Sequence, residues 1–228
     1  MLKIDQLSAF YGNKQVLNGL SLDCEKGKIH GILGRNGAGK TTFFKCLYGL
    51  LARQGGTFTF AGAPLKNGDI AYLETQNYFY PFLKGQEYLE LTTFKNAHFD
   101  INAWNKFFDL PLNDLVETYS TGMRKKLALL GTIGQNRPIL LLDEPFNGVD
   151  FETVETIYLI LDHLRKKEKV ILLTSHVLPT LTEVCDQISW LKAGQIETTF
   201  ERPSFDFLKQ KIKSEFQQGM EGVLEQLG

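Results

Sequence analysis

Apolar positions in the first sixty residues form short runs that glycine-containing turns separate. Four of these runs, at residues 2–10, 16–22, 29–33 and 56–60, predict strands. From about residue 70 onward, short apolar runs at 70–73, 139–142 and 170–174 alternate with helical periods. Between the last two runs, Val154, Ile157, Leu161 and Leu164 recur at spacings of three and four, which predicts a helix with one buried face. Strand, helix and strand in that order predict a right-handed crossover and an α/β fold with a mainly parallel sheet.

Composition limits the classes of function that the chain can have. Lys and Arg total 25 against 26 acidic residues, and a net charge of -1 gives no general attraction for nucleic acid, so we predict no nucleic-acid partner. Three scattered cysteines, Cys24, Cys46 and Cys185, argue against a disulfide framework and predict buried thiols in a reducing compartment. No run approaches the roughly 18 apolar residues of a membrane span, and no signal peptide is recognisable, so we expect a soluble protein that stays where it is made.

A glycine-rich segment follows the predicted strand at 29–33 and leads into a helical pattern at 42–50. Its glycines let the backbone turn tightly and present N–H groups to phosphate oxygens, and the helix directs its positive end at the same anion. Lys40 adds a mobile positive charge, and the Thr41 hydroxyl can ligate magnesium. A glycine-rich turn with a chance lysine would arise in roughly one chain in a hundred. We therefore predict that the whole segment binds a nucleotide phosphate group: Gly34, Arg35, Asn36, Gly37, Ala38, Gly39, Lys40, Thr41 and Thr42.

Two carboxylates follow the apolar strand at 139–142, at the strand end where open α/β sheets bind ligands. Asp143 suits magnesium, held through water, whereas Glu144 can polarise the attacking water as a general base. An acidic turn after a strand would be the simpler interpretation if the pair stood alone. Beside a phosphate loop, the pair predicts nucleotide hydrolysis.

Two further polar residues follow predicted strands. His176 comes after the strand at 170–174, and its imidazole would lie beside the other strand ends if the three strands are neighbours. Gln76 follows the strand at 70–73, and its amide could contact both magnesium and the lytic water. The alternative for His176 is a surface or capping histidine, and the alternative for Gln76 is a solvent-exposed loop glutamine.

The order of these motifs resembles the nucleotide-binding subunits of ABC transporters, over residues 2 to about 200. The resemblance rests on this succession along the chain: Tyr11, the phosphate loop, Gln76, the segment Tyr119-Ser120-Thr121-Gly122-Met123, the pair Asp143 and Glu144, the segment Asn147-Gly148-Val149-Asp150, and His176. It implies a P-loop NTPase core with an N-terminal antiparallel β subdomain and an inserted α-helical subdomain at about 77–119. The whole chain, 1–228, would form one ATPase domain. In its tail at about 203–228, Leu208, Ile212, Phe216, Met220 and Val223 recur at helical spacing, which predicts a helix that packs on the core, with regulation or a dimer contact as the alternatives.

The resemblance also implies roles for individual residues. Tyr11 would stack on adenine with Val16 alongside, and a hairpin-edge aromatic is the alternative for Tyr11. Gln76 would sense magnesium and the lytic water, Glu144 would be the general base, and His176 would hold the γ-phosphate. ATP and Mg²⁺ are therefore the expected cofactors, and ATP hydrolysis is the expected activity.

The segment 119–123 departs from the family's usual Leu-Ser-Gly-Gly-Gln and keeps only Ser120 and Gly122. By resemblance, these two residues and Asp150 act in trans on ATP bound by another subunit, in a head-to-tail homodimer or a heterodimer with a similar subunit. Ser120 also suits the N-cap of a helix through residues 127–133. The adjacent basic residues 124–126 predict a solvated helix face.

The expected partner is a separate transmembrane permease, which would place the chain on the inner face of the cell membrane. Aromatic residues between Gln76 and Ser120 would mostly pack the helical subdomain, with a few near Tyr78 to Phe82 lining a docking groove. Export is favoured over import. A GTP-binding switch is a poor alternative, because the base-reading motif is absent. A soluble ABC-type ATPase of DNA repair or translation, and a module that binds ATP without cleaving it, remain open.

Overall fold

A six-stranded sheet forms the centre of the protein, whose computed structural model describes residues 1–224. Its strand order is β10-β9-β3-β8-β7-β6, and every neighbouring pair is parallel except the outer pair of β10 and β9. The strands are β3 (Lys28–Leu33), β6 (Ile70–Leu73), β7 (Ile139–Asp143), β8 (Val170–Ser175), β9 (Gln187–Lys192) and β10 (Gln195–Glu201). The prediction of a mainly parallel sheet is confirmed.

The central strands are apolar because helices or a second sheet cover both of their faces. Every residue of β7 and β8 is buried, as expected for parallel strands inside an α/β fold. Leu33 of β3 pairs with Ser175 of β8, and Asp143 of β7 pairs with Thr174. Because these strands run in the same direction, their carboxyl ends meet at one edge of the sheet.

An antiparallel sheet of the N-terminal strands lies beside the central sheet, and α1 (Lys40–Tyr48) packs between the two. Its order is β2-β1-β4-β5, with β1 (Leu2–Tyr11), β2 (Lys14–Cys24), β4 (Gly55–Phe60) and β5 (Ala63–Pro64). Phe43 and Phe44 of α1 are fully buried between the sheets. This antiparallel subdomain confirms the expectation from the resemblance.

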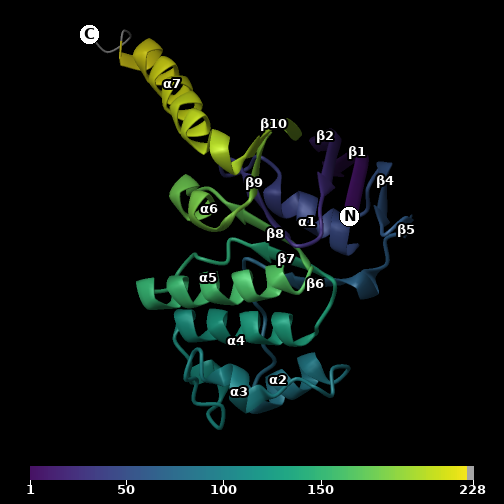
Figure 1. The fold of residues 1–228 in the computed structure, drawn as a ribbon, viewed down its shortest axis with the longest axis vertical. Helices are drawn as coiled ribbons and strands as arrows, with labels where there is room; N and C mark the ends of the chain where they lie inside the picture. The colour runs from purple at the N-terminus through teal and green to yellow at the C-terminus, as the bar shows by residue number, and fades with distance from the viewer. Residues whose placement is uncertain (225–228) are drawn as a thin grey trace.

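Helices cover the other face of the central sheet in successive layers (Figure 1). This face is covered by α5 (Phe151–Lys166), α6 (Leu178–Val184) and α4 (Thr121–Gly134), of which α4 packs against β6. The short helices α2 (Gly85–Thr93) and α3 (Ile101–Asn105) form the outermost layer, and Gly131 of α4 lies against Tyr88 and Thr92 of α2. Single turns of 3₁₀-helix stand at Asn67–Asp69, Val116–Thr118 and Arg202–Ser204.

The aromatic residues of the outermost helical layer are more exposed than the sequence suggested. Five of these rings are exposed, namely Tyr78, Tyr80, Phe82, Phe94 and Phe107, whereas Phe79, Phe99 and Trp104 are half-buried and Phe108 is buried. Tyr78, Tyr80 and Phe82 belong to the few that were expected outside the core. Phe94 and Phe107 were expected in the core and are exposed, because each lies just beyond the end of a short helix.

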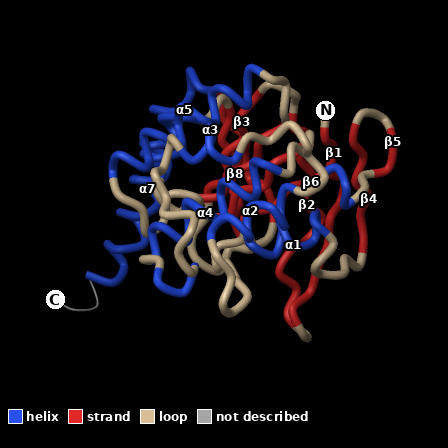
Figure 2. The backbone as a smooth tube through the Cα atoms, turned by 90° about the horizontal axis from the view of Figure 1, so that it is seen from below, coloured by secondary structure: helices blue, strands red, loops and turns tan. Residues whose placement is uncertain are grey.

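The C-terminal helix α7 (Phe205–Leu224) begins against the core and then projects away from it (Figure 1). Leu208 is fully buried and Ile212 is half-buried, so the start of the tail packs as predicted. For Phe216, Met220 and Val223, the structure describes the helical backbone and not the side chains, so the predicted packing of these three stays a prediction. Seen from below in Figure 2, α7 lies on the opposite side of the molecule from β5.

All three cysteines are buried and free, which confirms their predicted place in the core. Burial raises the pKa of the Cys24 and Cys185 thiols above the ordinary value and that of Cys46 to about 11. Within residues 1–224, no helix is long and apolar enough to cross a membrane.

Candidate nucleotide-binding site

The phosphate loop joins β3 to α1 and leaves the start of that helix uncapped. No side chain caps the helix at Gly39, so its first N–H groups remain available to an anion. Gly39 has a φ of 108°, and a Cβ there would lie 2.9 Å from Leu17 Cδ2. Only glycine therefore lets the loop approach β2 this closely.

Lys40 occupies the centre of the loop and is 7% exposed. Its Nζ donates to Gly34 O at 2.8 Å and lies 3.3 Å from Glu144 Oε1. The ammonium is thus held by loop carbonyls on one side and by a carboxylate on the other. A phosphate entering the loop would compete with that carboxylate for the same charge.

Three threonine hydroxyls hold the fully buried Asp143. Thr41 and Thr75 donate to Oδ2 at 2.7 and 2.6 Å, and Thr174 donates to Oδ1 at 2.6 Å. These donors come from α1, from the segment after β6 and from β8, so three elements position one carboxylate. Thr75 and Thr174 carried no signal in the sequence, because a threonine beside a strand end is common.

Glu144 follows directly and is 7% exposed. Its backbone N–H donates to Thr174 Oγ1 at 3.0 Å, and its Oε1 lies 3.0 Å from His176 Nδ1. Glu144 has a φ of 51°, a left-handed conformation that is uncommon for a residue with a side chain. The strained turn after β7 directs its carboxylate toward Lys40 and His176.

A hollow of about 510 Å³ gathers most of the predicted residues. Its lining includes Tyr11, Val16, Arg35, Asn36, Gly37, Gly39, Lys40, Thr41, Thr42, Glu144 and His176, together with Lys14, Thr75 and Asn147. Tyr11 is 74% exposed at the end of β1, so its ring is free to stack on a flat ligand. Gly34 and Ala38 shape the loop from behind, since Gly34 O accepts from Lys40 and Ala38 N donates to Arg35 O.

Gln76 is not among the residues that line this hollow. Its side chain is exposed, whereas the preceding residue, Thr75, lines the hollow and bonds Asp143. The role assigned to Gln76 therefore stays a prediction, and Thr75 is a further residue of the site that the sequence did not single out.

Ser120, Gly122 and Asp150 lie outside the hollow, where Ser120 and Asp150 cap helices and Gly122 stands in the first turn of α4. Ser120 Oγ accepts from Met123 N at 3.2 Å, which confirms the predicted cap of α4. Asp150 caps α5, and the hydroxyl and N–H of Thr153 lower the pKa of Asp150 to about 2. These residues therefore do not complete the site of their own chain.

The basic residues after Ser120 do not share one solvated face. Arg124 is exposed, Lys126 is half-buried and lies 3.5 Å from Asp150, but Lys125 is 7% exposed. Burial lowers the pKa of Lys125, while the nearby charges of Asp143 and Glu144 oppose that shift. The prediction of a solvated face is wrong for Lys125, because α4 turns this position toward the acidic strand end.

The oxygen ligands around Asp143 fit a magnesium ion. Mg²⁺ prefers carboxylates, hydroxyls, waters and phosphate oxygens, and it is bound by few protein groups. Thr41, Thr75 and Asp143 supply such oxygens at the edge of the hollow. No group of three or more His, Cys, Asp or Glu residues suited to a metal occurs in residues 1–224.

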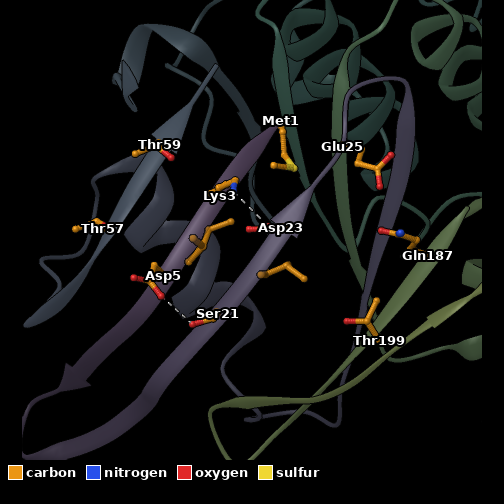
Figure 3. Close-up of a pocket in the computed structure, with 12 residues that line it drawn as sticks. Met1, Lys3, Asp5, Ser21, Asp23, Glu25, Thr57, Thr59, Gln187 and Thr199 are labelled. Atoms are coloured by element: carbon orange, nitrogen blue, oxygen red, sulfur yellow. Dashed lines mark hydrogen bonds and ion pairs between the residues drawn. The ribbon is translucent and has the colours of Figure 1, made fainter. Parts of the chain in front are cut away.

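A larger hollow of about 860 Å³ lies elsewhere, on the N-terminal sheet (Figure 3). It lies where β1 and β9 begin, whereas the phosphate loop lies where β3 and β9 end. Lys3 faces Asp23 at 3.9 Å and Ser21 faces Asp5 at 3.5 Å across β1 and β2. Two pairs of its polar groups thus contact one another, and none of the predicted site residues lines it.

A family model described as ABC transporter matches residues 17–147. The chain belongs to the ABC transporter family. The ABC transporter ATP-binding protein YtrB of Bacillus subtilis is 31% identical over 205 residues, which covers 86% of this chain and 70% of YtrB. The lantibiotic transport ATP-binding protein SrtF of Streptococcus pyogenes is 26% identical over 203 residues, covering 86% of this chain and 89% of SrtF.

Solved structures of ABC ATPases share the fold. The ATP-binding subunit of an ABC transporter superposes with a TM-score of 0.82 at 24% identity, covering 88% of this chain and 90% of that subunit. The dimeric cassette MJ0796, in a post-hydrolysis state bound to ADP and Pi, superposes at 0.80 with 21% identity over 89% of this chain and 99% of its own. The recognition of an ABC-type nucleotide-binding domain with ATPase activity is thereby confirmed.

Proposed function

We propose that this ABC ATPase hydrolyses Mg²⁺-ATP in the hollow at the phosphate loop and so drives a separate transmembrane permease. The convergence of Lys40, Glu144 and His176 from three segments on one hollow carries this proposal, together with the bond from Thr41 in the lining to the neighbouring Asp143. Adenine stacks on the exposed ring of Tyr11 with Val16 alongside. The triphosphate follows the loop toward the N-terminus of α1.

Phosphate binding and activation of the base are linked through Lys40. Without nucleotide, Lys40 and His176 both contact Oε1 of Glu144. A bound phosphate draws the Lys40 ammonium away, because its oxygens carry more charge than one carboxylate. Glu144 is then free to accept a proton from water, while His176 lies within reach of the terminal phosphate.

Thr41 and Asp143 would hold the metal, with Thr75 bonded to the same carboxylate and Gln76 in the adjacent position along the chain. When bound, Mg²⁺ neutralises charge on the terminal phosphates. The three threonine bonds keep Asp143 in place before any metal arrives. The chain's part in the reaction is therefore to orient these oxygen ligands and the base.

The site is completed in trans by a second subunit. Ser120 and Gly122 stand at the exposed start of α4, whose free N–H groups suit a phosphate. A Cβ on Gly122 would lie 3.4 Å from Gly148 O, so this start lies beside the segment 147–150. Together with Asp150, they form a surface for the ATP of another copy or of a similar subunit.

The permease binds at the exposed aromatic segment after β6. A hollow of about 230 Å³ there is lined by Tyr78, Phe79, Tyr80 and Pro81, with Glu117 and Arg124 beside them. Tyr78 and Tyr80 are 75% and 68% exposed, which is costly unless a partner covers them. The permease would hold the chain at the inner face of the cell membrane. The name of the relative SrtF, a lantibiotic transport protein, favours export, with import as the alternative.

Exchange of the base tests the proposal directly. With Mg²⁺-ATP, Glu144→Gln should retain ATP and accumulate as a dimer on a sizing column, while phosphate release falls at least about a hundredfold. Glu155→Gln, at an exposed position of α5, is the matched control. A Glu144→Gln protein with parental turnover would remove the assignment of the base, and absence of turnover in the parent with its permease would favour ATP binding alone.

Two further exchanges separate nucleotide binding from partner binding. Lys40→Ala should lose at least about tenfold in ATP affinity, since a charge-assisted contact is removed. Tyr78→Ala and Tyr80→Ala should instead keep ATP affinity and lose permease binding, with the exposed Phe207 exchanged as a control. Intact permease binding in both tyrosine variants would contradict the docking site.

A further inference from the structure

The hydroxyl of Tyr72 is buried and has no hydrogen-bond partner, and it is the one such side-chain atom in the described residues. The side chain of Asp143 lies near this hydroxyl, although the two do not meet the geometry of a hydrogen bond. Buried polar groups without a partner are rare, and a functional role is one of their explanations.

The sheet places Tyr72 on the same face as Asp143. Tyr72 of β6 pairs with Leu141 of β7, and side chains two residues apart on a strand share a face. Asp143 is thus the next side chain beyond Leu141 on the face that α1 covers. The ring of Tyr72 packs edge-on against Phe44 at 6.1 Å and lies 5.4 Å from Tyr48, so α1 holds its direction.

A count of hydrogen bonds shows that Asp143 can accept one more. A carboxylate offers about four acceptor positions. Thr41 and Thr75 use two on Oδ2, and Thr174 uses one on Oδ1. One position on Oδ1 remains, and the buried hydroxyl of Tyr72 lies near this carboxylate.

We propose that Tyr72 is a positioning residue for the magnesium site, and that its hydroxyl donates to Asp143 when the metal is bound. This inference rests on the proposed function. Oxygen atoms of Thr41 and Asp143 would hold the metal, so the Thr41 hydroxyl would no longer donate to Asp143, and the Tyr72 hydroxyl is placed to donate to this carboxylate instead. This hydrogen bond would stabilise the Asp143 carboxylate only in its metal-bound orientation. It would therefore strengthen magnesium binding and leave the affinity for metal-free nucleotide unchanged.

Two tyrosine-to-phenylalanine exchanges in the full chain test this role. Tyr72→Phe removes the hydroxyl and keeps the ring, and Tyr48→Phe removes a hydroxyl from the neighbouring, half-buried ring. Each protein is titrated with a non-hydrolysable ATP analogue, once with excess Mg²⁺ and once with EDTA. The dissociation constant in EDTA divided by that in Mg²⁺ measures how much the metal strengthens nucleotide binding, without any turnover.

The ratio should fall about five- to tenfold in Tyr72→Phe, with the affinity in EDTA within about twofold of the parent. Tyr48→Phe should match the parent in both conditions. The melting temperature of ligand-free Tyr72→Phe should equal or exceed that of the parent, because the exchange removes an unpartnered buried hydroxyl.

An unchanged ratio in Tyr72→Phe, or an equal fall in Tyr48→Phe, would overturn the role of Tyr72 and leave the proposed function intact. A lower melting temperature together with weaker binding in EDTA would show a structural role instead, and would overturn it as well. A parental protein that does not bind the analogue in either condition would overturn the proposed function, and this inference with it.

Discussion

Thr174 links the two acidic residues of the site, and its exchange to valine tests how they are positioned. Its hydroxyl donates to Asp143 Oδ1 at 2.6 Å and accepts from Glu144 N at 3.0 Å. Thr174 is fully buried, so no water can replace the lost hydroxyl without rearrangement. Valine has nearly the same shape, and the exchange therefore removes both bonds with little change in packing.

The magnitude follows from the two groups that lose a partner. A hydrogen bond to a charged group contributes about 1.5–3 kcal/mol, and an unsatisfied buried N–H costs about 1–3 kcal/mol. Because one hydroxyl makes both bonds, we expect a combined loss of about 2–5 kcal/mol in the free energy of unfolding. For a chain of 228 residues, this corresponds to a melting temperature lower by roughly 4–20 °C.

Urea unfolding without nucleotide measures this loss, and Thr132→Val is the matched control. Thr132 is also buried, but its hydroxyl donates only to Ala128 O within α4, at 2.8 Å. That exchange should cost no more than about 1 kcal/mol. Phosphate release by Thr174→Val should also fall at least about tenfold, since both acids lose a fixed contact. If both variants unfold at the same urea concentration, or if Thr174→Val keeps parental turnover, the reasoning is wrong.

Three smaller predictions use other features of the structure. Gly39→Ala should weaken ATP binding and stability far more than Gly37→Ala, because both positions have positive φ but only a Cβ at Gly39 meets Leu17; equal losses in calorimetric titration would contradict the steric argument. Ser120→Ala should cost about 1 kcal/mol of stability through the lost cap of α4, and should reduce ATP-dependent dimerisation while monomeric ATP binding is kept. Burial lowers the pKa of His30 below its usual 6.5. The neutral ring therefore contributes to stability above that pH, and this contribution is lost as the pH falls through the folded-state pKa. Unfolding experiments from pH 8 to 5 should show this loss in the parent and less of it in His30→Gln.

The sequence alone determined the elements and most of the site. The strands at residues 29–33, 139–142 and 170–174 were predictable because parallel strands buried on both faces are apolar throughout. The phosphate loop was predictable because its chemistry depends on local backbone turns and on the helix that follows. Asp143, Glu144 and His176 were predictable because each follows such a strand directly.

Only the tertiary structure decided which other residues join them. Thr75 bonds Asp143, Thr174 links the two acids, and the Tyr72 hydroxyl lies buried near Asp143. Lys125 is likewise buried, although its neighbours suggested a solvated face. These placements depend on the pairing register of β6, β7 and β8 and on the rotation of α4 about its axis. Register and rotation are set by contacts between segments far apart in the chain, and a local pattern of apolar and polar residues does not contain them.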